Sequence, residues 1–536
     1  MKPVLPHREL GSAKKNRSVG ILLTPTPSVT TKVCDPLSLA EEARHHQLEV
    51  GDRHHRRALG QFFTPAETAL LLASLSTLTL DRLRLLDAGA GAGALSAALI
   101  SEICSRSSRP KEIFLTAYEL DEALLSTLQD TLVACEKACD SSGISLKWDV
   151  RHTDFVESAV NSLDAGLFQT EQPRFDVAIL NPPYKKFRSE SRVRQLLRRV
   201  DIETSNLYAA FMALAVLLLD EGGELVAITP RSFCNGPYFR PFREHLLRNL
   251  NLTRLHVFES RGRAFQEDDV LQENLILRAV KGVPQQQLIC ISKSNSPKDP
   301  VEVWHNVSFD RVVRPHDREF FIHLVSDRVG HSLAKSMERL PCTLDSLRLS
   351  VSTGRVVDFR ARQWLRSGPT SETVPLIYAA HFDNGVVRWP KPNFKKPNAI
   401  LHNAETAPLM VPAGVYVLVK RFSSKEERRR VVAAIFDPDA VPCRAVGFEN
   451  HVNYYHEQGA PLDKAFARGL SVFLNCTSLD HYFRQFNGHT QVNATDLRSL
   501  RYPTRDALAE MGNRVGDVLP PQDDIDTIVK EILWEQ

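Results

Sequence analysis

The sequence predicts an α/β protein, in which a doubly wound, mostly parallel sheet is followed by a C-terminal domain of mixed α/β structure. Two observations predict the sheet and one predicts the second domain. Short apolar segments alternate with longer amphipathic ones from about residue 64 to residue 258, as in βαβ units whose helices cover both faces of a sheet. A glycine-rich turn also follows the first apolar strand. The chain of 536 residues is too long for one ordinary core.

The elements of the first domain follow from composition in chain order. A helix is expected from about Leu37, and another after Phe63, with Thr64 as its N-cap and Pro65 as its first residue. The elements after these alternate. Strands are expected at residues 83–89, 113–120, 175–183, 222–230 and 252–258, and helices at residues 94–103, 121–138, 206–219 and 237–250.

Three regions are expected along the chain. Residues 1–40 are polar, basic and rich in proline, serine and threonine, so we expect them to be largely disordered. Residues 41–300 carry the alternating pattern, and residues 301–536, where it loosens, form the second domain. No apolar run reaches the roughly 18–20 residues of a membrane span, and no signal-like apolar segment follows the N-terminal basic residues. We therefore expect no membrane association. The nine scattered cysteines are typical of reduced cytosolic thiols, and they predict no metal site.

The loop from Asp87 to Gly93 reads DAGAGAG and joins a strand to a helix. Its glycines allow the backbone to approach a ligand closely where helix N–H groups are free. Dinucleotide-binding folds use a similar turn. The spacing with an acid at the strand end, however, resembles the S-adenosylmethionine loop, because Asp87 suits a positively charged methionine group better than a pyrophosphate. Gly89 and Gly91 are the expected backbone contacts.

Two further acids follow successive strand segments. Glu119 could accept hydrogen bonds from both ribose hydroxyls, and Asp154 with Phe155 could receive the amino group and ring of an adenine. Taken singly, each acid is more commonly a surface carboxylate or a helix cap. Their order after the glycine loop predicts a binding site for S-adenosyl-L-methionine.

Asn181-Pro182-Pro183-Tyr184 lies at the end of the strand at residues 175–183, on the sheet edge where open α/β folds bind ligands. The side-chain carbonyl of Asn181 and the backbone carbonyl of Pro182 can both accept hydrogen bonds from one planar amine. Accepting both protons moves the nitrogen toward sp³ geometry and frees its lone pair for attack on the sulfonium methyl group. Tyr184 offers a flat face for a base.

These motifs resemble the gamma-class N6-adenine DNA methyltransferases of type II restriction–modification systems, which have a class I S-adenosylmethionine-dependent methyltransferase fold. Gly60-Gln-Phe-Phe-Thr64-Pro resembles the family motif whose threonine contacts the methionine end of the cofactor. The order of this motif, the glycine loop, NPPY and a C-terminal region is that of the gamma class. Residues 488–497 with Tyr502-Pro503 resemble the signature of the PstI/BsuBI-like branch. The resemblance covers roughly residues 55–505, and alanine replaces the proline that many relatives have after Asp87.

The resemblance implies a function and further site residues. Residues 41–300 would be the catalytic domain and residues 301–536 the DNA target-recognition domain. The enzyme would methylate N6 of adenine in double-stranded DNA after flipping the base. Phe265 would then pack against the flipped base opposite Tyr184. A cognate restriction endonuclease would be a separate chain, and the protein would be cytoplasmic and bacterial. The alternatives are an RNA adenine methyltransferase, a glutamine methyltransferase, an N4-cytosine enzyme and an inactive specificity module.

Charge distribution favours a nucleic-acid substrate. The net charge is only +3, but residues 341–500 contain 20 Lys and Arg against 14 Asp and Glu. Candidate phosphate contacts are Lys185, Lys186, Arg188, Arg192, Arg194, Arg198, Arg199, Lys395, Lys396, Lys420, Arg421 and Arg428 to Arg430. Candidate base-reading residues are His381, Asn384, Asn450, Asn453 and His489, although each is singly more typical of a surface or capping position.

Overall fold

The structure is a computed structural model that describes residues 35–164, 172–258, 273–299, 301, 305–315, 317–324, 328–423, 427–487 and 490–535. Asp35–Gln536 form one compact unit. The disorder expected for residues 1–40 concerns mainly residues 1–34, which lie outside the described residues. Phe265 also lies outside them. The boundary expected near residue 300 stays a prediction.

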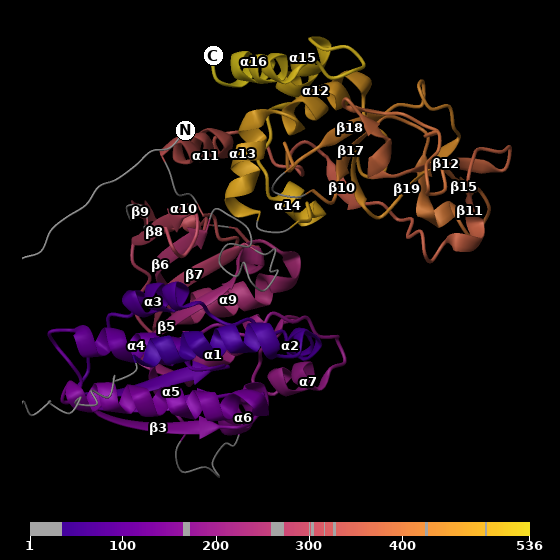
Figure 1. The fold of residues 1–536 in the computed structure, drawn as a ribbon. Coiled ribbons are helices and arrows are strands. Elements are labelled where there is room, and N and C mark those ends of the chain that lie inside the picture. Colours follow the sequence, from indigo (N-terminus) through magenta and orange to yellow (C-terminus); the bar gives the residue numbers. More distant parts are fainter. Residues whose placement is uncertain are drawn as a thin grey trace, which may run out of the picture. The chain divides into compact units, whose positions relative to one another are not determined.

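A nine-stranded sheet organises the first half of the chain, in the order β3-β2-β1-β4-β5-β7-β6-β8-β9 (Figure 1). Its strands are β1 (Arg82–Ala88), β2 (Glu112–Tyr118), β3 (Ser145–Arg151), β4 (Phe175–Leu180), β5 (Leu219–Pro230), β6 (Leu250–Phe258), β7 (Asn274–Lys281), β8 (Leu288–Ser294) and β9 (His305–Ser308). The run from β3 to β5 is parallel throughout, and β7 lies antiparallel between β5 and β6. The predicted mostly parallel α/β sheet is confirmed. The strands predicted from the sequence did not include β3, the antiparallel β7, β8 or β9.

Helices cover both faces of this sheet, because alternate residues of each strand face opposite sides. Val177 and Ile179 of β4 pack in one apolar core, whereas Ala178 and Leu180 pack in another. The first core is completed by α1 (Pro36–Val50), α3 (Ala66–Leu75), α4 (Ala94–Ser105) and α5 (Glu122–Ser141). The second is completed by α6 (Phe155–Asp164), α7 (Arg192–Arg198), α8 (Leu207–Leu218) and α9 (Arg240–Asn249). The sheet is therefore doubly wound.

The predicted helix start at Thr64 is wrong by one residue. The N-cap of α3 is Pro65, and no side chain of the cap residue bonds to the helix. The free N–H of Ala66 donates instead to Glu41 Oε2 at 3.0 Å. Since the glutamate from α1 serves the helix end, the Thr64 hydroxyl is left to another partner.

The C-terminal part combines two further sheets with helices, as the mixed α/β expectation requires. The six-stranded sheet has the order β10-β20-β17-β18-β14-β13, and the five-stranded sheet has the order β11-β15-β12-β19-β16. Their strands are β10 (Ser350–Thr353), β11 (Leu365–Arg366), β12 (Thr373–Ile377), β13 (Phe382–Asp383), β14 (Val386–Val387), β15 (Ala399–Leu401), β16 (Met410–Pro412), β17 (Tyr416–Lys420), β18 (Ala433–Phe436), β19 (Ala445–Phe448) and β20 (Val452–His456). The helices around them are α11 (Arg328–Glu338), α12 (Lys464–Leu474), α13 (Thr477–Phe486), α14 (Ala494–Arg498), α15 (Arg505–Asn513) and α16 (Gln522–Leu533). Among the described residues, no helix has the length and apolar character needed to cross a membrane.

Candidate active site

A cavity opens at the carboxyl ends of β1, β2 and β4, where doubly wound sheets bind ligands. It brings together seven of the residues that the sequence predicts for the site. They are Thr64, Gly89, Gly91, Glu119, Asp154, Phe155 and Asn181. We call it the first cavity. Pro183 lines it, whereas Asp87, Pro182 and Tyr184 do not.

The glycine loop reaches the wall of this cavity in a conformation that favours glycine. Gly91 has φ +60°, in the left-handed region. Its N–H donates to Glu119 Oε2 at 2.7 Å, and Glu119 Oε1 accepts from the N–H of Asp121 at 2.7 Å. Burial raises the pKa of the Glu119 carboxyl. The loop after β1 and the acid after β2 are thus locked together at one edge of the cavity.

Asp87 does not line the first cavity. It is fully buried, and its Oδ2 accepts from Ser96 Oγ at 2.6 Å. Burial raises the pKa of this carboxyl to about 7. The geometry therefore ties Asp87 to the first turn of α4, and its expected contact with a methionine group stays a prediction.

Asp154 and Phe155 occupy the start of α6. Asp154 Oδ1 accepts from the N–H of Val156 at 2.8 Å, so the carboxylate serves the helix terminus while it borders the cavity. The Phe155 ring lies between Tyr118 and Phe211, with centroid distances of 5.1 Å and 4.9 Å. This corner of the cavity presents a rigid aromatic edge beside a carboxylate.

Asn181 follows β4, and the NH₂ end of its side-chain amide is hydrogen-bonded within the protein. Its Nδ2 donates to the carbonyl of Phe62 at 3.0 Å and to Thr64 Oγ1 at 2.9 Å. Its Oδ1 is buried and has no hydrogen-bond partner among the described residues. A buried carbonyl oxygen without a donor is costly, so this atom is prepared for a donor that arrives with a ligand.

Tyr184 lies on the other side of the same loop. Its N–H donates to the carbonyl of Gly60 at 2.8 Å, and its ring packs against Phe62 at 5.2 Å and Tyr208 at 6.1 Å. Burial raises the pKa of the phenol, so the ring stays neutral. Gly60 has φ +73°, and a β-carbon there would lie 3.0 Å from the β-carbon of Lys185. Glycine is thus required where the two motifs meet.

A second cavity begins at Tyr184. Its volume is about 940 Å³, near the top of the roughly 300–1,000 Å³ range of ligand pockets. Catalytic-half residues in its lining include Lys186, Arg188, Tyr208 and Tyr238, and the C-terminal part adds Arg421, Thr490, Gln491 and Asn493. Asn181 borders the first cavity and Tyr184 the second, so the NPPY loop stands between them.

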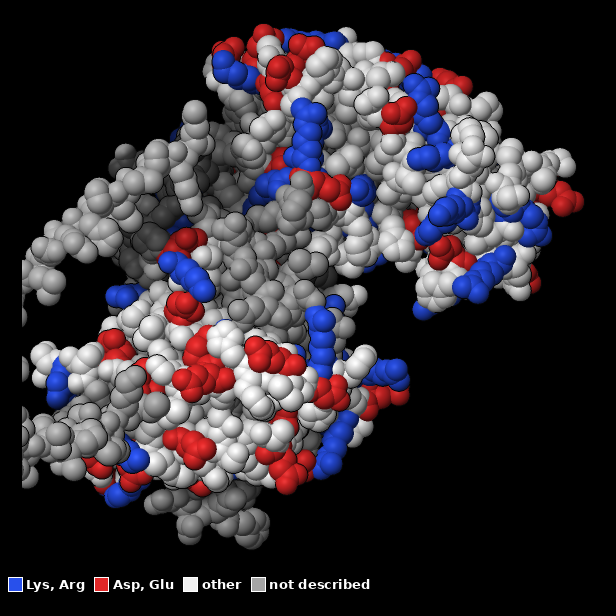
Figure 2. Space-filling model, in the orientation of Figure 1, with Lys and Arg blue, Asp and Glu red and all other residues white. Residues whose placement is uncertain are grey.

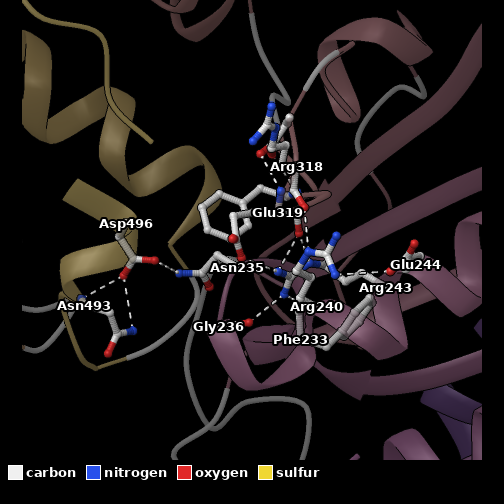
Figure 3. Close-up of polar contacts among 12 residues, drawn as sticks. Phe233, Asn235, Gly236, Arg240, Arg243, Glu244, Arg318, Glu319, Asn493 and Asp496 are labelled. Atoms are coloured by element: carbon white, nitrogen blue, oxygen red, sulfur yellow. Dashed lines mark hydrogen bonds and ion pairs between the residues drawn. The ribbon is translucent and has the colours of Figure 1, made fainter. Parts of the chain in front are cut away.

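A buried polar joint holds the C-terminal wall of the second cavity (Figure 3). Asp496 Oδ1 accepts from Asn235 Nδ2 at 3.2 Å, and its Oδ2 accepts from the N–H of Asn493 at 2.9 Å and from Asn487 Nδ2 at 3.0 Å. Arg243 holds the turn of Asn235, because its Nη1 donates to the carbonyls of Phe233 and Gly236. The helix α14 is therefore fastened to the segment after β5. Sequence reasoning missed this role, since nothing in the spacing pairs residue 235 with residue 496.

The predicted phosphate contacts divide into paired and unpaired groups. Arg192, Arg194, Arg198 and Arg199 form ion pairs with acids of the chain itself. Arg430 is buried and donates to internal oxygens, so its predicted phosphate contact is wrong. Lys186 and Arg188 are exposed and form no ion pair within the described residues.

The face in Figure 2 shows several Lys and Arg side chains over the part that carries β11, β12 and β15, with Asp and Glu between them. The exposed basic residues of this part include Arg362, Arg366, Lys391 and Lys395, and we call these four the basic surface. Two of the predicted base-reading residues are buried. His381 is buried and bonded to Asn398, and Asn453 is buried and bonded to the carbonyl of Val492. Both side chains form hydrogen bonds inside the fold. A third, His489, lies outside the described residues.

The doubly wound sheet with its antiparallel β7, the glycine loop and the NPPY turn define a class I S-adenosylmethionine-dependent methyltransferase fold. The family model described as Eco57I restriction-modification methylase matches residues 91–265. The type II methyltransferase M.PstI from Providencia stuartii is 44% identical over 482 residues, which cover 90% of this chain and 94% of the relative. The type II methyltransferase M.BsuBI from Bacillus subtilis is 43% identical over 484 residues, with 89% and 95% covered.

Among solved structures, the type IIL restriction-modification enzyme MmeI in complex with DNA has a TM-score of 0.51 at 11% identity, covering 94% of this chain and 74% of that one. This likeness shows the fold. The two relatives show the family: the chain belongs to the type II DNA methyltransferases of restriction–modification systems, in the branch of M.PstI and M.BsuBI. The cofactor of enzymes with this fold is S-adenosylmethionine.

Proposed function

We propose that this DNA methyltransferase methylates the N6 amino group of adenine at one short sequence in duplex DNA, with the adenine rotated out of the stack. The observation that carries the proposal is the buried Asn181 Oδ1. It lacks a donor among the described residues, and it lies in the loop between the two cavities. An exocyclic amino group supplies the donor that this oxygen lacks.

The residues of the first cavity fit S-adenosylmethionine. Glu119 and Asp154 provide acceptors for hydroxyl and amino groups, Phe155 provides an aromatic edge, and the backbone of Gly89 and Gly91 permits close approach. When bound, this cofactor supplies an electrophilic methyl group. Asn181 Oδ1 and the carbonyl of Pro182 would accept both amino protons and orient the nitrogen lone pair. No metal is needed for this chemistry, and no three His, Cys, Asp or Glu side chains gather as ligands in the described part.

The second cavity would hold the target nucleotide. An adenine inside a duplex cannot reach the edge of the sheet, so base flipping is required. Tyr184 would stack on the flipped base, and Phe265 would pack on its other face. Lys186 and Arg188, exposed at the rim, would contact the phosphates on either side.

Residues 301–536 would form the target-recognition domain, with the basic surface tracking the DNA backbone. The named relatives are type II methyltransferases from bacteria. A cognate restriction endonuclease as a separate chain and a cytoplasmic location agree with that assignment, and both belong to the proposal.

The test is methyl transfer from labelled S-adenosylmethionine to duplex DNA, with RNA and protein as parallel acceptors. Nucleosides resolved by mass are expected to contain N6-methyladenine, and sequencing is expected to map it to one short motif. N4-methylcytosine would overturn the base assignment. Label in RNA or protein, with none in DNA, would overturn the substrate.

A further inference from the structure

Thr64 contacts the catalytic loop although it lies 117 positions before Asn181 in the chain. Its Oγ1 accepts from Asn181 Nδ2 at 2.9 Å, in a buried hydrogen bond. The hydroxyl does not cap α3, because Pro65 is the N-cap and Glu41 accepts from the N–H of Ala66. Among the described residues, Asn181 is therefore the hydrogen-bond partner given to this hydroxyl, and that bond calls for an explanation.

The two contacts of Asn181 act differently. The carbonyl of Phe62 can only accept, so it requires the NH₂ end of the amide on its side. A flipped amide would place Oδ1 against that carbonyl, two acceptors facing each other. Thr64 Oγ1 takes the second amide proton. With both protons engaged, the NH₂ group is saturated and the plane of the amide is fixed by two partners.

The direction of Oδ1 follows from this arrangement. A single contact at Phe62 would leave the amide free to turn about that bond, and its second N–H could point at the incoming amine. Such an N–H would repel the very protons that Oδ1 has to accept. The orphaned, buried Oδ1 is then the only end of the amide offered to a ligand by the described residues.

We propose that Thr64 is a positioning residue for methyl transfer: its hydroxyl holds the Asn181 amide so that Oδ1 faces the acceptor amine. This inference rests on the proposed function, in which Asn181 accepts from that amine. It departs from the cofactor contact that the family resemblance implies for the threonine. Thr64 also lines the first cavity, so the Kd of the cofactor is measured to separate positioning from a cofactor contact.

The test compares Thr64→Val, which removes the hydroxyl at nearly constant shape, with Thr64→Ser, which keeps it. Thr68→Val is the matched control, since Thr68 lies on α3 just after Thr64, is fully buried and has a hydroxyl without a hydrogen-bond partner among the described residues. For each variant, kcat and KM for DNA are measured, with the Kd of S-adenosylmethionine obtained by calorimetry without DNA and the Tm by scanning fluorimetry.

Thr64→Val is expected to lower kcat roughly 10- to 100-fold, because a small misplacement of a reacting group costs that much. Its Kd for the cofactor should stay within about twofold of the wild type, and Thr64→Ser should restore most of kcat. Thr68→Val should keep the kcat of the wild type. A cofactor Kd that rises as far as kcat/KM falls would overturn the inference in favour of a cofactor contact, and an unchanged kcat would overturn it as well.

A double-mutant cycle separates positioning from folding. In an Asn181→Ser background there is no amide to hold, so adding Thr64→Val should change kcat little. The same loss in both backgrounds would overturn the inference. If Thr64→Val proves insoluble, Thr64→Ala replaces it as the variant without a hydroxyl.

The proposed function can fail separately. Wild-type protein that transfers no methyl group to adenine in duplex DNA refutes the proposed function. The Thr64 comparison is then made on whichever amine the wild type methylates.

Discussion

Asp496 is expected to make the joint at the C-terminal wall of the second cavity sensitive to pH. The carboxyl is fully buried, and burial raises its pKa to about 7 from an ordinary value of 3.8. The groups bonded to it are Asn235, Asn487 and Asn493, and the guanidinium of Arg243 acts on it through charge alone. Between these two pKa values the folded state holds a proton that the unfolded chain releases.

The direction in which stability changes with pH follows from this proton. Stability from Asp496 is fully present below about pH 4 and is lost as the pH rises through 7. A shift of about 3 units corresponds to about 4 kcal/mol in total, and about 3 kcal/mol of it is lost between pH 5 and pH 8. Asp496→Asn cannot titrate and is expected to show a smaller loss over this range.

Hydrogen exchange measured by mass spectrometry reports the opening free energy of α14 and the segment before it, corrected for the intrinsic exchange rate at each pH. The difference between wild type and Asp496→Asn should change by about 3 kcal/mol from pH 5 to pH 8. Asn235→Ala serves as the control, since it removes one donor and no ionisable group. It should lower protection at both pH values while keeping the wild-type trend. Parallel profiles for wild type and Asp496→Asn would refute the reasoning.

Substitutions at three other positions probe the NPPY loop and the Gly60 turn that contacts it. Asn181→Ala removes the acceptor and should lower kcat by about 100-fold or more while cofactor binding changes little, and an equal loss of both in kinetics and calorimetry would contradict the role of Asn181. Tyr184→Phe keeps the ring and should retain most activity, whereas Tyr184→Ala should raise KM for DNA and lower kcat. Equal rates for the two Tyr184 variants would argue against stacking. Gly60→Ala forces a side chain into φ +73° against Lys185 and should lower stability by about 1–2 kcal/mol, seen as a lower Tm, and an unchanged Tm would contradict that strain.

Local sequence patterns predicted most of the catalytic half. Strand and helix periodicity, together with glycine and proline at turns, predicted β1, β2, β4, β5 and β6 with the helices α4, α5, α8 and α9, because these signals act over a few neighbouring residues. The same signals place Gly89, Gly91, Glu119 and Asn181 at strand ends. Carboxyl ends of parallel strands share one sheet edge, so these residues were expected to meet, and the first cavity brings them together.

Predictions of which group a side chain bonds to were less accurate. Thr64 was expected to cap α3, but Glu41 of another helix serves that end, and the hydroxyl bonds to Asn181 instead. Asp87 is fully buried and accepts from Ser96 Oγ, a bond that the sequence did not predict, and its expected ligand contact stays a prediction. Arg430 and His381 read as surface residues and are buried. The residue types that cap helices or bind phosphate are the same as those that form buried hydrogen bonds. Residue type alone therefore cannot tell these roles apart.

The sequence by itself determined the fold class, the order of the motifs and the residue types that line the first cavity, because hydrophobic period and turn chemistry are short-range properties of the chain. Tertiary structure alone decided which end of the Asn181 amide faces the ligand and which segment closes the second cavity. Both depend on hydrogen bonds between residues more than 100 positions apart, Thr64 with Asn181 and Asn235 with Asp496. Such pairings exist only once the sheet has brought distant segments together. Until then no neighbouring donor or acceptor favours one orientation of the amide over the other.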